Sequence, residues 1–204
     1  RTQYGVLSMR QKIIGVVNTK GGSGKSTVAI HLAHAALEDE RDVCLIDADT
    51  QGTVKDWASV RADNRKPPRV ICDADPLSLH GTIERLQNDL VIVDSPAGLS
   101  EITGEVLGIS DLVLVPVAPS MLDLWGMGEF EEIRSERAER GLKVALVTTK
   151  YNHASKLGEQ MAEHVEEEYP YYEHFAGGLC SRVVYKRQMM KGQTVLEASD
   201  EKAK

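Results

Sequence analysis

The sequence predicts an α/β fold, in which a doubly wound, mostly parallel sheet carries helices on both faces. Three observations support this class. Short apolar runs rich in β-branched residues alternate with longer segments that have the apolar spacing of helices, which is typical of repeated βαβ units. A glycine-rich turn joins the first run to the first helical segment, and two later runs end in aspartate. In open parallel sheets the ligand lies at the carboxyl ends of the strands.

The expected elements follow this alternation along the whole chain. The strands share short apolar runs with few charges, and they are Ile13–Val17, Val43–Ile46, Val70–Cys72, Leu90–Val93, Leu112–Val117 and Lys143–Thr149. The crossover helices share amphipathic spacing, and they are Val28–Glu38, Thr53–Val60, Leu77–Asn88, Leu122–Arg140 and Ser155–Glu167. The acidic side of the last segment is expected to be a solvated helix face.

The turn after the first strand has the composition of a phosphate-binding loop. Glycines let the backbone curl so that successive N–H groups point at phosphate oxygens, and the following helix adds its positive N-terminal end. The expected nucleotide-binding residues are Lys20, Gly21, Gly22, Ser23, Gly24, Lys25, Ser26 and Thr27. Lys25 is suited to the β- and γ-phosphates, and the Ser26 hydroxyl to Mg²⁺. Thr19 stands where the G-x-x-x-x-G-K-[ST] pattern has its first glycine, so the loop is a variant.

Two carboxylates follow the second strand, in the run Leu45-Ile46-Asp47-Ala48-Asp49-Thr50-Gln51-Gly52. This strand end faces the phosphate loop in the expected fold, so an aspartate there could polarise an attacking water close to the metal. We expect one of the two, Asp47 or Asp49, to take this role, and Asp47 and Gln51 to belong to a switch segment. The alternative for Asp47 is that it only ends the strand.

The fourth expected strand also ends in a carboxylate, in the form of a Walker-B strand. It delivers Asp94 to the Mg²⁺ shell, and the residues from Ser95 to Gly98 are expected to form a turn that responds to the γ-phosphate. Ser95, Pro96 and Gly98 are therefore the second group of predicted switch residues. An apolar run before Asp is common in proteins, so this signal depends on its order after the phosphate loop and the paired aspartates.

Together these motifs resemble the ParA/MinD class of ATPases, which are P-loop NTPases with a deviant Walker A loop, and most of all the small ParA-type (ParF-like) partition ATPases. The resemblance extends from Ile13 to about Ser199 and includes Asp111 to Ser120 and the stretch from Arg182 to Ala198. It implies ATP and Mg²⁺ as cofactors, a homodimer formed on ATP binding, and a first lysine, Lys20, that reaches the partner's ATP. It also implies that Asp49 is needed for hydrolysis, although Thr50 replaces the usual proline there.

Composition sets limits on the cellular setting. The chain has 204 residues, of which 42% are hydrophobic and 27% charged, consistent with one compact domain over 12–204 and a flexible arm or non-native remnant over 1–11. No apolar run approaches the roughly 18 to 20 residues of a membrane span, so we expect a cytoplasmic protein without a membrane partner. Three widely spaced cysteines argue against a disulfide framework.

The one basic cluster in this acidic chain, which has 24 Lys and Arg against 31 Asp and Glu, lies near its end. Arg182, Lys186, Arg187 and Lys191 have a spacing that can place them on one side of a helix, where a dimer would present a stripe for phosphates of non-specific DNA. The alternative is a solvated face. Taken with this cluster, the resemblance to ParA-type proteins implies a nucleoid-associated ATPase for plasmid or chromosome partition, stimulated by a ParB-like or other cargo adaptor.

Other functions remain open at this stage. The same machine positions protein cargoes such as carboxysomes or chemosensory clusters, and a nucleotide-gated regulatory scaffold would not bind DNA at all. A small-molecule ligase of the dethiobiotin-synthetase type would need a polar substrate pocket beside the γ-phosphate, and no residue group in the sequence is dedicated to one. The last residues, Glu197 to Lys204, do not have the pattern of the basic amphipathic helix of MinD-like proteins, so we do not expect a MinD-like membrane protein.

Overall fold

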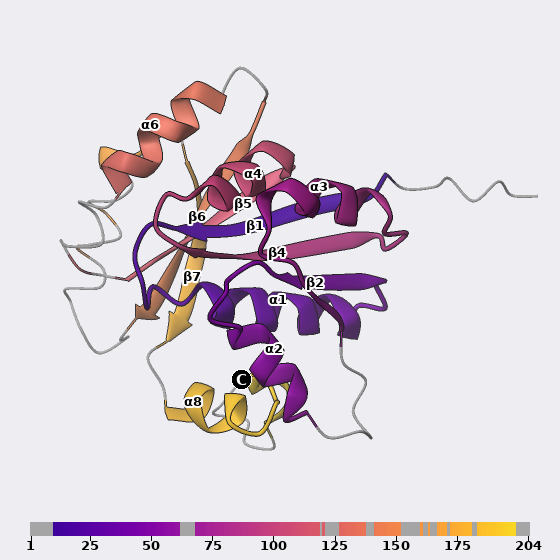
Figure 1. Cartoon of the computed structure of the whole chain (residues 1–204). Helices are drawn as coiled ribbons and strands as arrows, with labels where there is room; N and C mark the ends of the chain where they lie inside the picture. Colours follow the sequence, from indigo (N-terminus) through magenta and orange to yellow (C-terminus); the bar gives the residue numbers. More distant parts are fainter. Residues whose placement is uncertain are drawn as a thin grey trace, which may run out of the picture.

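A computed structural model shows a single parallel sheet between two layers of helices (Figure 1). It describes residues 10–61, 68–118, 120, 127–137, 141–151, 160, 163, 167–170, 172–180 and 183–198. Within these residues the sheet has seven strands in the order β3-β2-β4-β1-β5-β6-β7, and all neighbouring strands pair in parallel. The predicted fold class is confirmed.

The strands are β1 Lys12–Asn18, β2 Val43–Asp47, β3 Arg69–Cys72, β4 Leu90–Ala97, β5 Leu112–Val117, β6 Lys143–Tyr151 and β7 Glu173–Cys180. The helices are α1 Lys25–Glu38, α2 Thr53–Ser59, α3 Pro76–Glu84, α4 Glu101–Ile109, α6 Met127–Arg137 and α8 Val183–Met189, with a 3₁₀ turn, η2, at Val195–Glu197. No helix among the described residues is long and apolar enough to cross a membrane.

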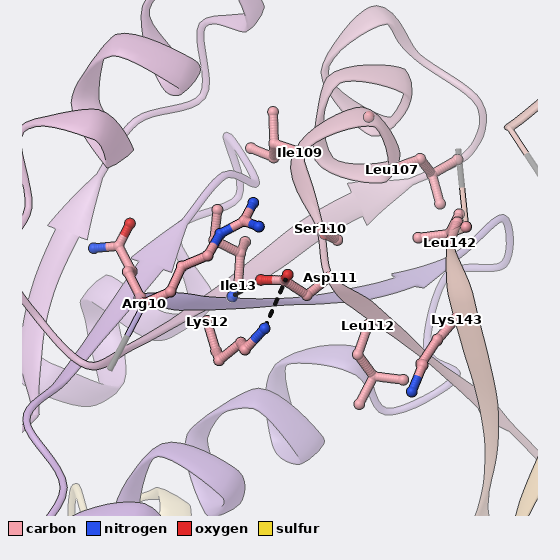
Figure 2. A pocket seen from close by; sticks show the side chains of 13 residues that line it. Arg10, Lys12, Ile13, Leu107, Ile109, Ser110, Asp111, Leu112, Leu142 and Lys143 are labelled. Atoms are coloured by element: carbon pink, nitrogen blue, oxygen red, sulfur yellow. Dashed lines mark hydrogen bonds and ion pairs between the residues drawn. The ribbon is translucent and has the colours of Figure 1, made fainter. Parts of the chain in front are cut away.

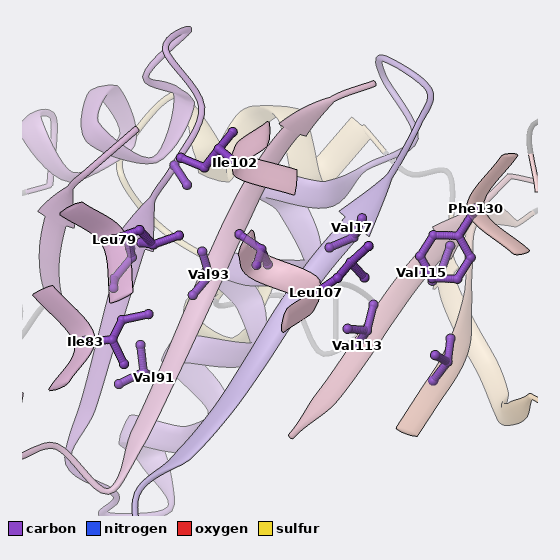
Figure 3. Close-up of a cluster of buried hydrophobic side chains, with 14 of the residues drawn as sticks. Val17, Leu79, Ile83, Val91, Val93, Ile102, Leu107, Val113, Val115 and Phe130 are labelled. Atoms are coloured by element: carbon purple, nitrogen blue, oxygen red, sulfur yellow. The ribbon is translucent and has the colours of Figure 1, made fainter. Parts of the chain in front are cut away.

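Alternate residues of the central strands supply two cores. Val17, Val93 and Val115 point to the face covered by α3, α4 and α6, where they meet Leu79 and Leu107 (Figure 3). The neighbouring residues on the same strands point to the opposite face, which α1 and α2 cover (Figure 1). Because helices bury both faces, these strands are almost continuously apolar, and their apolar runs allowed the strands to be predicted from the sequence.

The order of the strands places a topological switch next to β1. The chain runs from β1 outward to β2 and β3, returns to β4 beside β1, and then crosses to β5 on the other side of β1. Ligands in such sheets bind outside the carboxyl ends of the strands at this point. The carboxyl ends of β1, β2 and β4 carry the phosphate loop, Asp47 with Asp49, and Asp94, respectively.

Several boundaries differ from the expectation. β4 continues to Ala97, so Ser95 to Ala97 extend the strand and do not form the predicted turn. α1 begins at Lys25 and not at Val28, and the structure adds α4 and β7, which were not expected from the sequence. Gln11, within the expected arm, donates hydrogen bonds to the carbonyl oxygens of Leu86 and Asn88, at 3.2 Å each. Most of the expected 155–167 helix lies outside the described residues.

Candidate functional site

The phosphate loop turns through two glycines with left-handed backbone angles. Gly22 has φ +73° and Gly24 has φ +103°, values that residues with a Cβ rarely adopt. Gly24 is also the N-cap of α1, and its carbonyl accepts the Val28 N–H at 2.9 Å, so the helix starts directly at the loop. The N-terminal end of α1 is therefore directed at the space enclosed by the loop, as anion binding requires.

Lys25 is buried and crosses the interior of this loop. Its Nζ donates a hydrogen bond to the carbonyl oxygen of Lys20, 3.0 Å away. Burial lowers the pKa of this ammonium group, whereas the negative charges of Asp94 and Asp49 raise it. Lys25 thus lies in the field of both predicted carboxylates. Of the other predicted loop residues, Gly21 and Gly22 are exposed, Ser23 is buried, and Lys20, Ser26 and Thr27 are half-buried.

Two side chains that were not predicted from the sequence hold the loop in place. Asn18, the last residue of β1, accepts the Lys20 N–H at 2.8 Å and donates to the Pro116 carbonyl at 2.6 Å. The Thr149 hydroxyl donates to the Ser23 carbonyl at 2.6 Å. Asn18 could have been suspected as the polar residue that ends an apolar strand, whereas nothing local marks Thr149, which comes from β6.

The paired aspartates have different surroundings. Both carboxylate oxygens of Asp47 accept backbone N–H groups, from Asp49 at 3.2 Å and from Lys55 at 2.9 Å. Burial nevertheless raises the pKa of Asp47, and the same N–H groups oppose the rise. Asp49 is half-buried, and one of its oxygens accepts the N–H of the exposed Gln51 at 2.9 Å. Asp47 therefore shapes the loop that leads into α2, and Asp49 lies close enough to Lys25 for its charge to raise the pKa of that lysine.

Asp94 is fully buried in β4, which lies between the strand that precedes the phosphate loop, β1, and the strand that ends in Asp47, β2. In the ladders it is level with Val16 of β1 and Asp47 of β2. Neither of its carboxylate oxygens has a hydrogen-bond partner among the described residues. Burial raises its pKa to about 7; the nearby Ser26 hydroxyl and Lys25 lower it, and Asp47 and Asp49 raise it. Two buried, unsatisfied oxygens beside a serine hydroxyl fit a divalent cation with its bound waters.

The segment after Asp94 contacts the phosphate loop directly. The Gly98 N–H donates to the Thr19 carbonyl at 2.8 Å, and Gly98 has φ +88°. Ser95 is buried and Pro96 half-buried within the extended strand. The predicted turn does not begin at Ser95, because the chain pairs with β1 as far as Ala97, opposite Asn18, before it leaves the sheet.

A small cavity adjoins the loop on its other side. It measures about 150 Å³ and lies among Gly24, Thr27, Lys150, Tyr185 and Lys186, with Thr149, Leu179 and Cys180 completing the wall. The cavity thus connects the start of α1 with the first residues of α8. Lys150 has φ +55°, an uncommon backbone angle for a residue other than glycine.

The predicted DNA-binding residues are only partly on one helix. Lys186 and Arg187 lie exposed in α8, which appears below α1 and α2 in the view of Figure 1. Lys191 is exposed in the turn after α8, because the helix ends at Met189, so the expectation of a single helix face is corrected for this residue. Arg182 lies outside the described residues.

A separate cavity of about 690 Å³ lies at the opposite edge of the sheet, at the amino ends of β1, β5 and β6 (Figure 2). Arg10, Lys12 and Lys143 line it together with apolar residues of α4, and Lys12 pairs with Asp111 at 3.4 Å. None of the predicted site residues lines this cavity. It is therefore separate from the predicted nucleotide site.

Comparison with known proteins agrees with this geometry. Residues 14–195 match the model of the CobQ/CobB/MinD/ParA nucleotide binding domain. The maintenance of carboxysome distribution protein A of Halothiobacillus neapolitanus is 32% identical over 191 residues, which are 90% of this chain and 86% of that protein. The chromosome-partitioning ATPase Soj of Thermus thermophilus is 26% identical over 189 residues, with 76% of each chain covered.

Solved structures agree on the fold. An aspartate-to-alanine variant of McdA from Cyanothece, in complex with ATP, superimposes with a TM-score of 0.75 at 18% identity, over 92% of this chain and 90% of that one. The match to the family model covers nearly all of the domain and includes every predicted nucleotide-site residue. The chain therefore belongs to the CobQ/CobB/MinD/ParA family of nucleotide-binding domains, and its relatives are ParA-class proteins.

Proposed function

We propose that this chain is an ATP hydrolase that dimerises on binding ATP, binds DNA without sequence preference, and positions a cargo. One observation carries the proposal: a buried lysine inside a glycine-rich loop lies in the field of two carboxylates, one of which is buried without hydrogen-bond partners among the described residues. Burying an unsatisfied carboxylate destabilises a fold, so its retention at this point supports a role in binding.

The residues divide the chemistry among them. The N–H groups from Gly21 to Thr27 and the Lys25 ammonium group would hold the phosphates. Ser26 and Asp94 would hold Mg²⁺, which neutralises phosphate charge when bound. Asp49 would orient the attacking water, and Asp47 keeps the Asp49 loop in shape through its two backbone contacts. We expect hydrolysis to be weak in the isolated protein because Asp49 and Gln51 lie on a loop that a partner must fix.

Dimerisation would complete the site. The Lys20 backbone is held by Asn18 and Lys25, so its side chain starts from a fixed point at the rim of the loop. We infer that this side chain crosses to the partner's nucleotide. The Gly98 to Thr19 contact links the second switch segment to the same loop, which provides a route by which Ser95, Pro96 and Gly98 respond to the γ-phosphate.

DNA binding would come from the basic end of the chain. Lys186, Arg187 and Lys191 are exposed, and two copies in a dimer would present six cations to phosphate oxygens. Such contacts position a protein without reading bases. We propose that this surface keeps the ATP-bound dimer on the nucleoid.

The cargo has two candidates, and each is supported by a relative. The name of the Halothiobacillus protein concerns carboxysome distribution, and that of the Thermus protein concerns chromosome partitioning. Plasmid or chromosome partition and the positioning of a protein cargo use the same ATPase cycle in this proposal. In both cases a ParB-like or other adaptor on the cargo would stimulate hydrolysis and release the subunits from DNA.

The test is the binding of non-specific duplex DNA across a salt series, with ADP, with ATP, and with ATP on an Asp49→Ala variant. We expect binding only with ATP, a steep decrease with salt, and persistence in the variant, whose ATP is not hydrolysed. A measurement of phosphate release checks that the variant does not hydrolyse ATP. Absence of DNA binding in every state would exclude the DNA-riding function and favour the nucleotide-gated scaffold.

A further inference from the structure

The C-terminal segment 183–198 is joined to the two helices that begin at the nucleotide-facing loops. α1 begins at Lys25 in the phosphate loop, and α2 begins at Thr53, directly after the Asp49 loop. The segment contacts both helices through buried polar groups and carries the cations Lys186, Arg187 and Lys191. We call six residues that join the segment to these helices the clamp. They are His31 and His34 of α1, Arg61 after α2, and Thr194, Val195 and Glu197 of the segment.

The contact near α2 is a two-point ion pair. Arg61, just after α2, donates from its two terminal nitrogens to the two oxygens of Glu197, at 3.0 Å each. The side chains of Arg61 and Glu197 are only 2% and 10% exposed. Arg61 also donates to the Gly192 carbonyl at 2.6 Å and lies over the Trp57 ring. A fork-to-fork pair of this kind fixes orientation as well as distance.

The contact on α1 consists of two histidines one helical turn apart. His31 Nδ1 donates to the Thr27 carbonyl at 2.8 Å, which leaves Nε2 to accept the Val195 N–H at 3.1 Å. His34 Nδ1 and the Thr194 hydroxyl share a hydrogen bond of 3.0 Å. Thr27, the carbonyl partner of His31, lies in the first turn of α1, directly after the phosphate loop. The contact therefore connects the first turn of α1 to the segment through one imidazole ring.

Stability alone explains this arrangement poorly. A buried ion pair gives up much of its attraction to desolvation, and well-packed apolar residues often stabilise a fold as well or better. What such a pair supplies is a defined geometry between the elements that it joins. Here those elements are the helix after the Asp49 loop and the segment with the basic residues. The Tyr185 ring of α8, 5.1 Å from the His31 ring, adds a direct contact between α8 and α1.

We propose that the clamp makes Arg61 and Glu197 positioning residues for the DNA-binding surface, so that the nucleotide state at the starts of α1 and α2 sets the position of α8. The proposal rests on the proposed function for its DNA readout. The relay itself is a property of the chain and can be measured without DNA. Glu197→Gln is the sharpest change, because it keeps the shape and an acceptor while it removes the charge from the pair.

The experiment compares the wild type with Glu197→Gln, each with ADP and with a non-hydrolysable ATP analogue. Hydrogen exchange of the amides in 183–193 is measured first, with nucleotide affinity determined in parallel. We expect the wild type to show a nucleotide-dependent change in exchange that is absent from Glu197→Gln, at unchanged nucleotide affinity. We also expect the preference of DNA binding for the ATP state to fall by about tenfold, the size of a typical coupling between sites.

Controls separate the relay from general damage. Glu84→Gln removes the same kind of charge from an exposed pair with His80 on α3 and should preserve both responses. If Glu197→Gln does not fold, Arg61→Lys keeps the charge and removes the two-point contact. The proposal is overturned if exchange in 183–193 is the same with both nucleotides in the wild type, or if the variant responds like the wild type. Absence of DNA binding in every protein and state would contradict the proposed function, and exchange would still decide the clamp.

Discussion

At the scale of single residues, three aspartates that look alike in sequence have three different surroundings. Asp47 is satisfied by backbone N–H groups, Asp49 accepts the Gln51 N–H in a local turn, and Asp94 is buried without hydrogen-bond partners among the residues that the structure describes. Asp94 is therefore the carboxylate whose oxygens remain available to a cation, whereas those of Asp47 already hold the backbone of the loop.

Replacing Asp94 with asparagine should increase stability and impair function. The change removes a buried charge that lacks hydrogen bonds, so the nucleotide-free protein should become more stable by about 1–3 kcal/mol at pH 8. Mg²⁺ should strengthen ATP binding less than in the wild type, because only Ser26 of the two proposed ligands remains unchanged. Urea unfolding and nucleotide titrations with and without Mg²⁺ measure the two effects. Asp47→Asn is the matched control and should destabilise, because its amide group meets two N–H donors; equal effects of the two changes would refute this assignment.

His31 should make stability depend on pH. Burial lowers its pKa to about 4, with the Thr27 carbonyl and Glu197 opposing the shift and His34 adding to it. Between about pH 6.5 and 4 the unfolded chain therefore binds a proton that the folded chain excludes, and the free energy of unfolding should fall as pH falls, by up to about 1.4 kcal/mol per unit. This contribution is fully present above about pH 6.5.

The measurement is urea unfolding of the wild type and His31→Gln at several pH values from 7.5 to 4.5. Glutamine can reproduce both a donor and an acceptor without titrating in this range. We expect a shallower pH dependence in the variant, whatever its stability at neutral pH. Parallel curves for the two proteins would show that His31 is not the group responsible.

At the scale of elements, glycine explains why the phosphate loop could be predicted from the sequence and why β7 and α4 were missed. Glycines with a lysine and a serine marked the phosphate loop. In β7 the pair Gly177-Gly178 lowered the apparent strand propensity, yet Gly178 is needed there because a Cβ would overlap the Thr148 carbonyl of β6. In α4, Gly104 and Gly108 weakened the helical pattern of a helix that tertiary packing stabilises.

Gly192 should be required for docking of the C-terminal segment. It has φ +64°, and a Cβ added there would lie 2.5 Å from the backbone of Arg61. Gly192→Ala should therefore destabilise by more than the roughly 1–2 kcal/mol of backbone strain alone. Gly141→Ala isolates that strain, since Gly141 has φ +72° and no described neighbour within 4 Å of an added Cβ. Urea unfolding compares them, and equal destabilisation would mean that the close approach to Arg61 contributes nothing.

At the scale of the whole molecule, the strand order brings residues from distant parts of the sequence to one edge of the sheet. The fold class, the loop and the carboxylate strands were predictable because they depend on local pattern and on the right-handed βαβ rule. The contact of Thr149 with the phosphate loop and the clamp could not be predicted, because Thr149 and Glu197 meet their partners only after the sheet and the helices have packed.

Lys20→Ala should uncouple nucleotide binding from dimerisation. Lys25 and the loop N–H groups remain, so ATP should still bind to the monomer, whereas the partner's phosphates no longer receive a second ammonium group. Light scattering with a non-hydrolysable ATP analogue measures the dimer, and a nucleotide titration measures binding. Lys150→Ala, a change to a lysine elsewhere beside the loop, serves as the control. A normal ATP-dependent dimer in Lys20→Ala would refute the cross-subunit role.

Removing the exposed basic residues should weaken DNA binding in a way that salt reveals. Lys186, Arg187 and Lys191 contact phosphates in the proposed dimer, so their replacement by alanine should reduce the slope of log affinity against log salt by up to about 0.9 for each phosphate that is no longer neutralised. Stability should change by no more than about 0.5 kcal/mol for each replacement, since all three side chains are exposed. The matched control replaces Arg10, Arg41 and Lys143, which are exposed near the amino ends of strands, at the opposite edge of the sheet from the nucleotide loop. Both triple variants remove the same formal charge, so an effect of net charge alone would lower DNA affinity equally in the two. A local binding surface would lower the affinity only in the variant of Lys186, Arg187 and Lys191. An equal decrease would place the DNA-binding surface elsewhere on the molecule.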